Sequence, residues 1–544
     1  MEGRVELLVM KETALPPCVV FEDADLLVVH KPPGWNTHSP APFAGEGIYE
    51  WFRNRSPRWE RLAIIHRLDK DTSGLLVFGK TAEANRSLTE QFARRKVHKE
   101  YVLVTDRTVN RDSWVIQSNI RRVGDRYVSG SPQDGGDPAE TRFRVLRSDE
   151  SGTWIAAEPV TGRTHQIRVH ASSHGFPILG DTLYGGAPAH RLHLHSGRLR
   201  LFHPRSGEAL EWEVPPEFSS PASGLLRRAM ITPSETDACR RIHGAADGVP
   251  GRYLDQLGRW SLVEGEGEAP SESEVRNLLE RSSVESEGVY FKALRRHVRQ
   301  TAPGDACPSL RGGVEAPSRF EIRENGLRFE LSFQEGYSTG IFLDQRDNRR
   351  RLLTRHVGAG FPWSPGGDGM PGELLNCFAY TCAFSVAGAA GGMRTTSLDL
   401  SRKYLDWGRR NFVLNGLDPA GHDFIYGDVF DWLGRLAKKA RRFQAIVLDP
   451  PTFSRSREHG DFRAESDYGD LVQLALPLLA PGGILLASTN ASRLSPEDFV
   501  AAVRMAINGS GRRCLAELYI PQPPDFPITR DEPAHLKTFW CAVS

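Results

Sequence analysis

Residues 66–76 (HRLDKDTSGLL) gather side chains that could act as acids, bases or nucleophiles. Apolar runs at residues 62–65 and 75–78 flank them, and two short apolar runs around charged residues and a glycine predict a strand, a loop and a strand. Loops held by strands commonly present reactive side chains. The positive charge of Arg67 would keep the Asp69 carboxylate ionised and able to act as a nucleophile or a base. The alternative is a surface turn with ordinary ion pairs.

The same stretch resembles the catalytic motif of the RluA-type pseudouridine synthases, H-R-L-D-x-x-T-S-G-L. The resemblance implies that Asp69 is the nucleophile and that His66 and Arg67 contact the substrate. The implied reaction converts uridine in RNA to pseudouridine. The glycosidic bond breaks, and the uracil turns and rejoins through carbon, without a cofactor. An enzyme that acts on a base in folded RNA generally takes that base out of the stack first.

Two later motifs extend this resemblance. Residues 99–101 match K-x-Y, whose tyrosine lies against the target base in the family, which implies the same place for Tyr101. Residues 161–170 match T-G-R-x-H-Q-I-R-x-H, whose second arginine pairs with the catalytic aspartate, which implies that Arg168 is the partner of Asp69. A planar guanidinium can hold a carboxylate through two parallel hydrogen bonds and so fix its direction. The remaining substrate contacts that this motif implies are Arg163, His165 and Gln166.

The elements that must hold these residues follow from the surrounding pattern. Residues 19–23 and 26–31 predict two strands joined by a turn, 82–96 a helix and 99–104 a strand. Residues 130–140 are rich in glycine, proline and aspartate and predict a loop. The resemblance covers roughly residues 15–218, and it implies an α+β domain with a mixed sheet.

A second group of candidate residues lies near the C-terminus, where strands and helices alternate. Strands are predicted at 373–378, 395–400, 423–428, 443–451 and 484–490, with helices at 402–415 and 431–440. This alternation predicts an α/β doubly wound, Rossmann-like parallel sheet that binds ligands at the carboxyl ends of its strands. No G-x-G-x-x-G follows the first strand, which weakens the interpretation as a dinucleotide-binding enzyme.

Residues 449–453 (DPPTF) resemble the D-P-P-x-F motif of class I AdoMet-dependent methyltransferases that act on nucleic-acid bases. The resemblance implies that Asp449 is catalytic, that the Pro450 carbonyl faces the base and that Phe453 stacks on it. Residues 340–349 and 375–381 resemble two motifs of the RlmI-type ribosomal RNA methyltransferases. By that match the AdoMet site comprises Gln345, Arg346, Asn376, Phe378, Tyr380, Thr381, Asp399 at the ribose and Asp428 near the adenine. Cys382 stands where that family usually has glycine, so its side chain is expected to crowd the cofactor loop.

The methylated atom is constrained by the absence of a cysteine. Enzymes that make 5-methylcytosine attack the ring with a cysteine thiol, because carbon five needs covalent activation. Neither residues 449–452 nor 488–492 contain one. Residues 449–454 and 401–411 resemble the 7-methylguanosine half of the RlmKL ribosomal enzyme. We therefore expect methylation of guanine, at N7 or N2, in large-subunit ribosomal RNA.

With 544 residues the chain is too long for one core, and two to four domains are expected. We predict a pseudouridine synthase domain over residues 1–218 and a linker over 219–232, followed by a small β-rich module over 233–334 and the methyltransferase domain over 335–544. A net charge of +1 gives no general attraction to nucleic acid, so RNA binding must use local basic patches. The seven cysteines form no C-x-x-C pair, which argues against a disulfide framework or a zinc site and fits a reducing cytosol.

Three hypotheses follow. The first is a bifunctional enzyme that makes pseudouridine and methylates a base in RNA. The second is an RNA-binding protein in which only the synthase is active and the methyltransferase domain docks RNA. The third, a small-molecule methyltransferase, is disfavoured by the attached synthase. We expect a cytoplasmic monomer whose partner is ribosomal or transfer RNA, with no metal and no membrane contact, because residues 1–6 lack the form of a signal peptide and no apolar run approaches the ~20 residues of a membrane helix.

Overall fold

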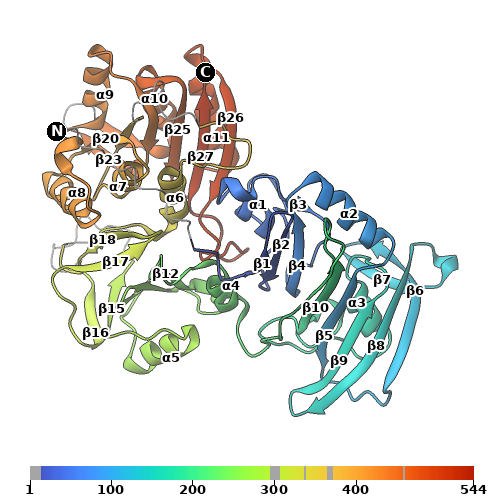
Figure 1. Cartoon of the computed structure of the whole chain (residues 1–544). Helices are drawn as coiled ribbons and strands as arrows, with labels where there is room; N and C mark the ends of the chain where they lie inside the picture. Colours follow the sequence, from blue (N-terminus) through green and yellow to red (C-terminus); the bar gives the residue numbers. More distant parts are fainter. Residues whose placement is uncertain (1–13, 295–306, 336–337, 364–371, 457–459) are drawn as a thin grey trace, which may run out of the picture. The chain divides into compact units, whose positions relative to one another are not determined.

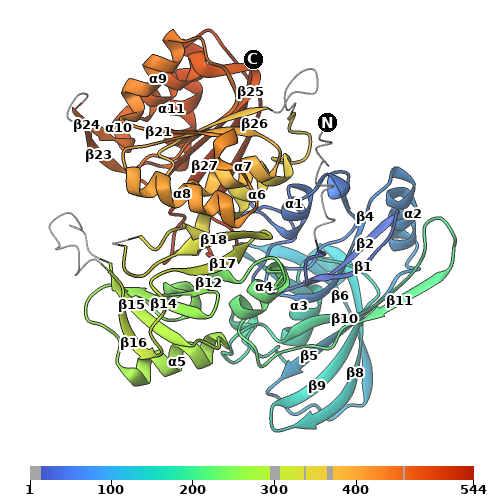
Figure 2. The same ribbon diagram turned by 60° about the vertical axis from the view of Figure 1, so that its left-hand side comes forward.

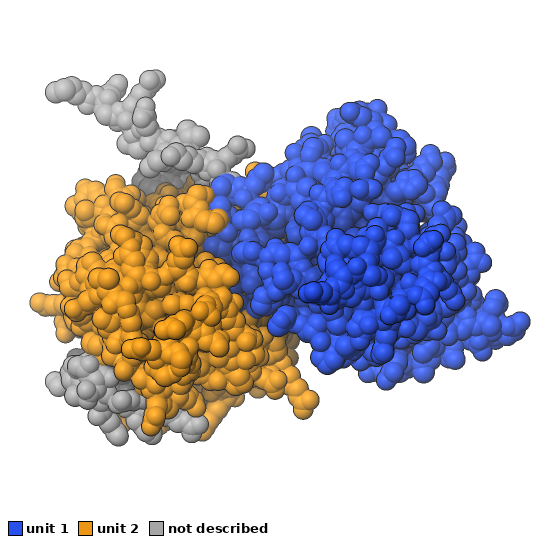
Figure 3. Space-filling model, turned by 90° about the horizontal axis from the view of Figure 1, so that it is seen from below, with its two compact units in different colours: residues 1–38, 47–49, 61–232 blue, residues 39–46, 50–60, 233–544 orange. Residues whose placement is uncertain are grey.

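The computed structural model describes residues 14–294, 307–335, 338–363, 372–456 and 460–544. The chain divides into two compact units, which Figure 3 shows in different colours. Unit 1 comprises Met1–His38, Gly47–Tyr49 and Arg61–Thr232, and unit 2 comprises Ser39–Glu46, Glu50–Glu60 and Pro233–Ser544. The predicted β-rich module and methyltransferase part therefore belong to one unit.

Unit 1 is built on an 11-stranded mixed sheet (Figure 1). The strand order is β1-β2-β4-β10-β5-β9-β8-β6-β7, with β3 beside β4 and β11 beside β10. Only β4 and β10 run parallel, so the expected α+β domain with a mixed sheet is confirmed. The strands are β1 (Val19–Glu22), β2 (Leu26–Lys31), β3 (Ala63–Ile64), β4 (Ser73–Gly79), β5 (His98–Thr105), β6 (Ser113–Val123), β7 (Arg126–Gly130), β8 (Asp137–Asp149), β9 (Gly152–Pro159), β10 (Leu194–Phe202) and β11 (Ala209–Glu213).

The helices of unit 1 are α2 (Ala82–Ala93), α3 (Gln166–Ser173) and α4 (Ala222–Met230), and the first two residues of α1 (Ile48–Arg53) also belong to it. The predicted helix over 82–96 is therefore confirmed with an earlier end. The prediction of a loop over 130–140 is wrong in part, because β8 already begins at Asp137. The prediction of a linker over 219–232 is also wrong in part. Residues 222–230 form α4, which buries Leu225, Leu226 and Met230.

Unit 2 begins with a five-stranded sheet in the order β12-β13-β14-β15-β16, accompanied by helix α5 (Glu272–Ser282) and by the hairpin β17–β18. The strands are β12 (Ala238–His243), β13 (Arg252–Leu257), β14 (Trp260–Gly265), β15 (Gly288–Ala293), β16 (Ser309–Gly313), β17 (Phe320–Glu324) and β18 (Leu327–Leu331). This arrangement agrees with the β-rich composition predicted for residues 233–334.

The rest of unit 2 is a seven-stranded sheet in the order β21-β20-β19-β22-β25-β27-β26. The first five strands run parallel, and β27 is antiparallel to both of its neighbours. The strands are β19 (Glu373–Cys377), β20 (Arg394–Asp399), β21 (Asp423–Tyr426), β22 (Phe443–Leu448), β25 (Leu479–Thr489), β26 (Cys514–Pro521) and β27 (Lys537–Val543). A separate two-stranded hairpin, β23 (Phe453–Ser456) and β24 (Gly460–Arg463), follows β22.

Two layers of helices cover this sheet (Figure 2). One comprises α6 (Arg346–Thr354), α7 (Ala383–Ala390) and α8 (Arg402–Leu414), and the other α9 (Val429–Lys438), α10 (Ala464–Ala475) and α11 (Pro496–Gly509). Along β22, Ile446 and Leu448 join one hydrophobic cluster while Ala445 and Val447 join another. The sheet is therefore buried on both faces, as expected for a parallel sheet with helices on each side. The predicted doubly wound fold is thus confirmed. None of the helices described could span a membrane.

Candidate active sites

Asp69 lies in the loop between β3 and β4, and its side chain is 28% exposed. The loop is tied to the end of β2 by the buried Lys31. The Lys31 ammonium donates to the backbone carbonyls of Pro32 and Lys70, each at 3.0 Å, and of Trp35 at 2.8 Å. Burial lowers the pKa of Lys31 to about 7, and the neighbouring Asp71 and Asp69 carboxylates act against this shift. Lys31 therefore holds the backbone that presents Asp69 without forming a hydrogen bond to it.

Arg168 is brought to Asp69 from helix α3, almost 100 residues further along the chain. Its Nη1 lies 3.6 Å from Asp69 Oδ2. The opposite edge of the guanidinium is bound by the buried Asp181, whose carboxylate accepts from Nε at 2.7 Å and from Nη2 at 2.8 Å. The bidentate pair expected between Arg168 and Asp69 is thus formed with Asp181 instead. It fixes the guanidinium and leaves one nitrogen facing Asp69.

An aromatic side chain and an imidazole complete the surroundings of Asp69. Tyr101 on β5 is 7% exposed; burial raises the pKa of its hydroxyl, and the charge of Asp69 adds to that effect. His165 Nε2 lies 3.8 Å from Asp69 Oδ2, and its Nδ1 is 2.8 Å from the hydroxyl of Tyr184. The structure therefore brings Asp69, Arg168, Tyr101 and His165 together, as the sequence predicted.

The other expected contacts lie differently. His66 Nε2 accepts from the backbone of Val77, and burial lowers the pKa of His66 to about 3. Gln166 is buried, and its amide bonds Thr161, Arg163, Glu140 and Thr141 within its own unit. Both residues hold the local backbone. Arg67 is exposed, and among the described residues the cation beside Asp69 is Arg168, so the expected pairing with Arg67 is wrong. Arg163 is 41% exposed.

Replacing Asp181 by asparagine should reduce pseudouridine formation without weakening RNA binding. The amide would offer one acceptor where the carboxylate offers two, and it would lose the charge that holds Arg168 in place. Hydrogen bonds to charged groups contribute about 1.5–3 kcal/mol, so kcat/KM should fall by about 10- to 100-fold while the Kd for RNA stays within about threefold. The exposed Asp112→Asn is the matched control. A fall in RNA affinity instead of kcat would contradict this positioning role.

The second site lies at the carboxyl ends of β22 and β25. Asp449 follows β22, and its Oδ2 accepts from Gln345 Nε2 at 3.2 Å. The same Gln345 nitrogen donates to Ser488 Oγ at 2.7 Å. Burial raises the pKa of Asp449 to about 6. The hydroxyl of Tyr468 on α10 joins the two strand ends: it lies 2.8 Å from the Leu448 carbonyl and accepts from the Ser488 amide at 2.8 Å. Sequence reasoning assigned Tyr468 no role.

The loop after β19 has an unusual backbone. Phe378, Tyr380 and Cys382 all have φ between +48° and +61°, a region that residues with side chains adopt only under constraint. Asp399 at the end of β20 constrains the loop, since its carboxylate accepts from the amides of Tyr380 and Ser401, each at 2.8 Å. Such a turn between the first two strands brings backbone close to a ligand at the strand ends. This geometry fits an adenosine cofactor whose ribose approaches Asp399.

The Cys382 side chain packs against helix α8. It is fully buried, and a Cβ built at Gly408 of helix α8 would overlap its Sγ. The glycine in α8 therefore makes the space that the cysteine fills. Because the thiol packs against the helix, the structure offers no support for the expected crowding of the cofactor loop.

The remaining expected residues also have definite places. Arg346 is buried in a bidentate pair with Asp525, at 2.8 and 2.7 Å. Asn376 donates to Ser385 Oγ, and the hydroxyl of Thr381 donates to the Gly340 carbonyl. These three contacts hold the loop and helix backbone. Asp428 caps helix α9 by accepting from the Phe430 amide at 2.8 Å. Pro450 is buried, and the Arg463 guanidinium lies 5.1 Å from the Phe453 ring centroid.

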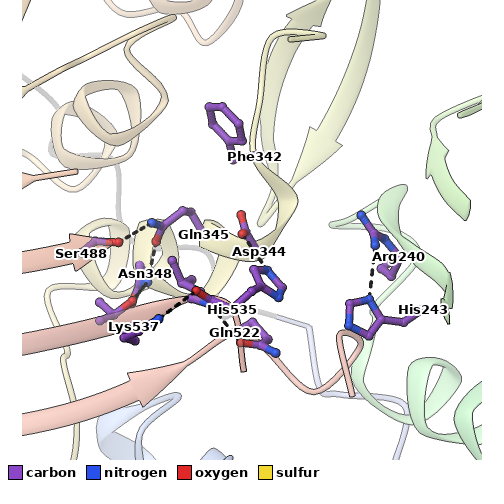
Figure 4. Close-up of polar contacts among 12 residues, drawn as sticks. Arg240, His243, Phe342, Asp344, Gln345, Asn348, Ser488, Gln522, His535 and Lys537 are labelled. Atoms are coloured by element: carbon purple, nitrogen blue, oxygen red, sulfur yellow. Dashed lines mark hydrogen bonds and ion pairs between the residues drawn. The ribbon is translucent and has the colours of Figure 1, made fainter. Parts of the chain in front are cut away.

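Sequence reasoning also missed the pair formed by Asp344 and His535, which Figure 4 shows near Gln345. His535 Nε2 lies 3.1 Å from Asp344 Oδ2, and the charge of Asp344 acts on Asp449. Asp344 belongs to the stretch 340–349 that resembles a family motif, so the sequence marked this residue, although no role was assigned to it. No group of three or more His, Cys, Asp or Glu residues in the described part of the chain could hold a metal ion.

Comparisons with known families match the two parts of the chain separately. Residues 25–173 match the family described as RNA pseudouridylate synthase. Residues 285–540 match the family described as S-adenosylmethionine-dependent methyltransferase. The chain is 39% identical over 227 residues to the ribosomal large subunit pseudouridine synthase C of Yersinia pestis, covering 39% of this chain and 70% of that protein.

Two further relatives match the C-terminal part. The chain is 32% identical over 351 residues to a ribosomal RNA large subunit methyltransferase of Deinococcus radiodurans, covering 62% of this chain and 81% of that protein. Among solved structures, the candidate methyltransferase SMU.776 in complex with SAH is similar with a TM-score of 0.50 and 26% identity. That match covers 63% of this chain and 87% of SMU.776.

Proposed function

Because the chain belongs to the RNA pseudouridylate synthase family in its N-terminal part and to the AdoMet-dependent methyltransferase family in its C-terminal part, we propose that it modifies ribosomal RNA in two ways. It is a pseudouridine synthase and an AdoMet-dependent RNA methyltransferase. One observation supports both activities above the rest: each unit holds a carboxylate with a fixed partner, Asp69 in the loop between β3 and β4 and Asp449 directly after β22.

In the synthase, Asp69 is the nucleophile. Arg168 faces it through a single nitrogen, so the carboxylate keeps a fixed direction while its second oxygen remains available. Asp181 prevents the guanidinium from closing onto Asp69 as a bidentate pair, which would engage both oxygens. Tyr101 offers a buried ring beside Asp69 for a uracil that has left the RNA stack.

In the methyltransferase, Phe378, Tyr380 and Thr381 would line the cofactor, and Asp399 would hold its ribose hydroxyls. When bound, AdoMet supplies a methyl group on a positively charged sulfur. Asp449 and the Pro450 carbonyl face the incoming base, and Gln345 fixes Asp449 through the hydrogen bond to Oδ2. A carboxylate at this point favours positive charge that develops on the base.

We propose guanine in large-subunit ribosomal RNA as the methylated base. The names of the two curated relatives both specify the large ribosomal subunit. The cysteine that attack on cytosine carbon five would need is absent from residues 449–452 and 488–492. Mapping pseudouridine and methylated bases in RNA from cells with and without the gene tests this assignment. Loss of one pseudouridine and one methylguanine from large-subunit RNA supports it, and loss of marks from transfer RNA alone would refute it.

AdoMet binding separates this proposal from the alternative in which the methyltransferase domain only docks RNA. Because Cys382 packs against Gly408, wild-type protein should bind AdoMet measurably by calorimetry, and Cys382→Gly should change the Kd by less than about threefold. Asp399→Asn should weaken binding by about 10-fold or more, because it replaces a charged hydrogen-bond acceptor. Lys438→Met, at the exposed end of α9, is the control. Absence of binding by the wild type would favour the docking alternative.

A further inference from the structure

Three side chains that Figure 4 labels have no role in the reaction described so far: Phe342, Asp344 and His535. Phe342 is 51% exposed, and its ring lies 5.6 Å from that of Tyr380 in the cofactor loop. Asp344 is 19% exposed and His535 38% exposed. An aromatic ring, a carboxylate and an imidazole in this part of unit 2 are therefore at least partly open to solvent.

Phe342 is exposed but not loose. Its backbone carbonyl accepts from Arg349 Nη2 at 2.7 Å, and Arg349 is itself held by the buried Glu324 at 2.6 and 2.7 Å. A large apolar ring that is about half exposed contributes little to the hydrophobic core. It is, however, the kind of surface on which proteins stack bases that have left an RNA helix.

Asp344 is held in its ionised form. Burial acts to raise the pKa of Asp344, but His535, Arg349 and Arg240 outweigh it and lower the pKa below its ordinary value. Its Oδ2 is bonded by His535, whereas its Oδ1 forms no hydrogen bond to any residue in the described part of the chain. The site thus offers a fixed anionic acceptor with one open oxygen.

We propose that Phe342 stacks on the target guanine while Asp344, oriented by His535, accepts hydrogen bonds from the N1–H and N2–H groups of that base. This inference rests on the proposed methyltransferase function and names the residues that select its base. Of the four RNA bases, only guanine carries two adjacent donors on its Watson–Crick edge, so an anionic acceptor discriminates in its favour. Adenine and cytosine each place a ring acceptor beside their amino group, which would oppose the carboxylate.

Binding by this edge leaves N7 on the opposite side of the base. Transfer of a methyl group to N7 uses the nitrogen lone pair to form the N–C bond, returns the S–C bond pair to sulfur and leaves a positive charge on the ring. That charge makes N1–H a stronger donor, so its hydrogen bond to Asp344 strengthens in the transition state. An interaction that strengthens there raises kcat as well as affinity.

The β-rich module supports the same residues. His243 at the end of β12 lies with its ring 5.6 Å from that of Phe526 and 6.0 Å from that of His535. Tyr253 on β13 donates to Glu532 at 3.2 Å. Both contacts hold the segment between β26 and β27 that carries His535. The module therefore helps to build the base-selecting part of the site.

The test uses the full-length protein and synthetic RNA that carries the mapped methylation site with either guanine or inosine at the target. Inosine keeps N7 and N1–H but lacks the N2 amino group. Wild type should methylate inosine RNA with kcat/KM about 10- to 100-fold lower, because one hydrogen bond to a charged acceptor is lost. Asp344→Asn should reduce activity on guanine by a similar factor and bring the guanine-to-inosine ratio close to one. Phe342→Leu should raise KM about 10-fold and leave the ratio unchanged.

Controls separate this inference from the proposed function. The exposed Asp470→Asn should keep the wild-type ratio, and calorimetric AdoMet binding should be unchanged in every variant, which shows that unit 2 is folded. Retention of the guanine preference by Asp344→Asn would overturn the inference alone. Complete failure of wild type on inosine RNA would also overturn it, because the methylated atom would then be N2. Methylation of cytosine by the wild type would overturn the proposed function as well.

Discussion

Asp69→Ala should abolish pseudouridine formation while methylation of the same RNA continues at the wild-type rate. The carboxylate is the group that the mechanism uses as a nucleophile, and alanine has no group that could attack in its place. Loss of a nucleophile typically lowers kcat by at least about 10⁴-fold. Release of tritium from RNA labelled at carbon five of uracil measures the reaction, because that hydrogen is lost when the base rejoins through carbon.

Two further variants make this result specific. Asp69→Asn keeps the shape of the side chain and should be equally inactive, since an amide is a poor nucleophile. Asp106→Asn, a partly exposed acid in the turn after β5, should keep full activity. Methylation by each variant reports that the chain is folded. Tritium release by Asp69→Ala above about one hundredth of the wild-type rate would show that another residue is the nucleophile.

The partner of Asp69 illustrates what the sequence could predict. Proximity along the chain suggested Arg67, which the structure leaves exposed. The resemblance suggested Arg168, which lies 3.6 Å away. A charged neighbour two residues along a loop need not face the same way, because the backbone direction of a loop is not fixed by local propensity. The motif carried information about tertiary structure that residue spacing alone did not.

Most of the fold followed from hydrophobic periodicity. The five parallel strands of unit 2 and their alternation with helices were predictable, although several strand ends differ from the prediction. Errors occurred where composition was the only guide. Residues 219–232 looked like a linker, yet α4 forms because its leucines find an apolar surface. Whether such a segment forms a helix depends on its packing in the folded protein, which the local sequence does not reveal.

The residues that position each site were much harder to predict than those that react. Asp181 contacts Arg168 from a turn 13 residues away, and His535 reaches Asp344 across 191 residues. Neither pair has a spacing that a helix or a strand would impose. Their contacts depend on strand order, in particular on the antiparallel β27, which brings residue 535 back to the same sheet edge as Asp449. Only the assembled sheet reveals that edge.

Asp449→Asn should abolish methylation and leave pseudouridine formation unchanged. Removing one fixed electrostatic group from an active site typically lowers kcat by about 10²- to 10³-fold. Because the pKa of Asp449 is about 6 and the carboxylate form is required, wild-type methylation should also fall as the pH drops through 6. Incorporation of a labelled methyl group into RNA at pH 5–8 measures both effects. The exposed Asp470→Asn should keep the wild-type profile.

The same substitution should make unit 2 more stable, with a dependence on pH that follows from linkage. The folded pKa of about 6 exceeds the ordinary 3.8, so between these values the folded state binds more protons than the unfolded state. Stability therefore falls as pH rises through this window and stays lower above it. At 1.36 kcal/mol per pKa unit the loss of stability is about 3 kcal/mol, and Asp449→Asn removes this loss.

The unfolding temperature of unit 2 should rise in the variant at pH 8 and match wild type near pH 4. An equal effect at both pH values would mean that the Asp449 carboxylate carries no burial penalty. An acid whose removal makes the folded unit more stable is retained because catalysis needs it.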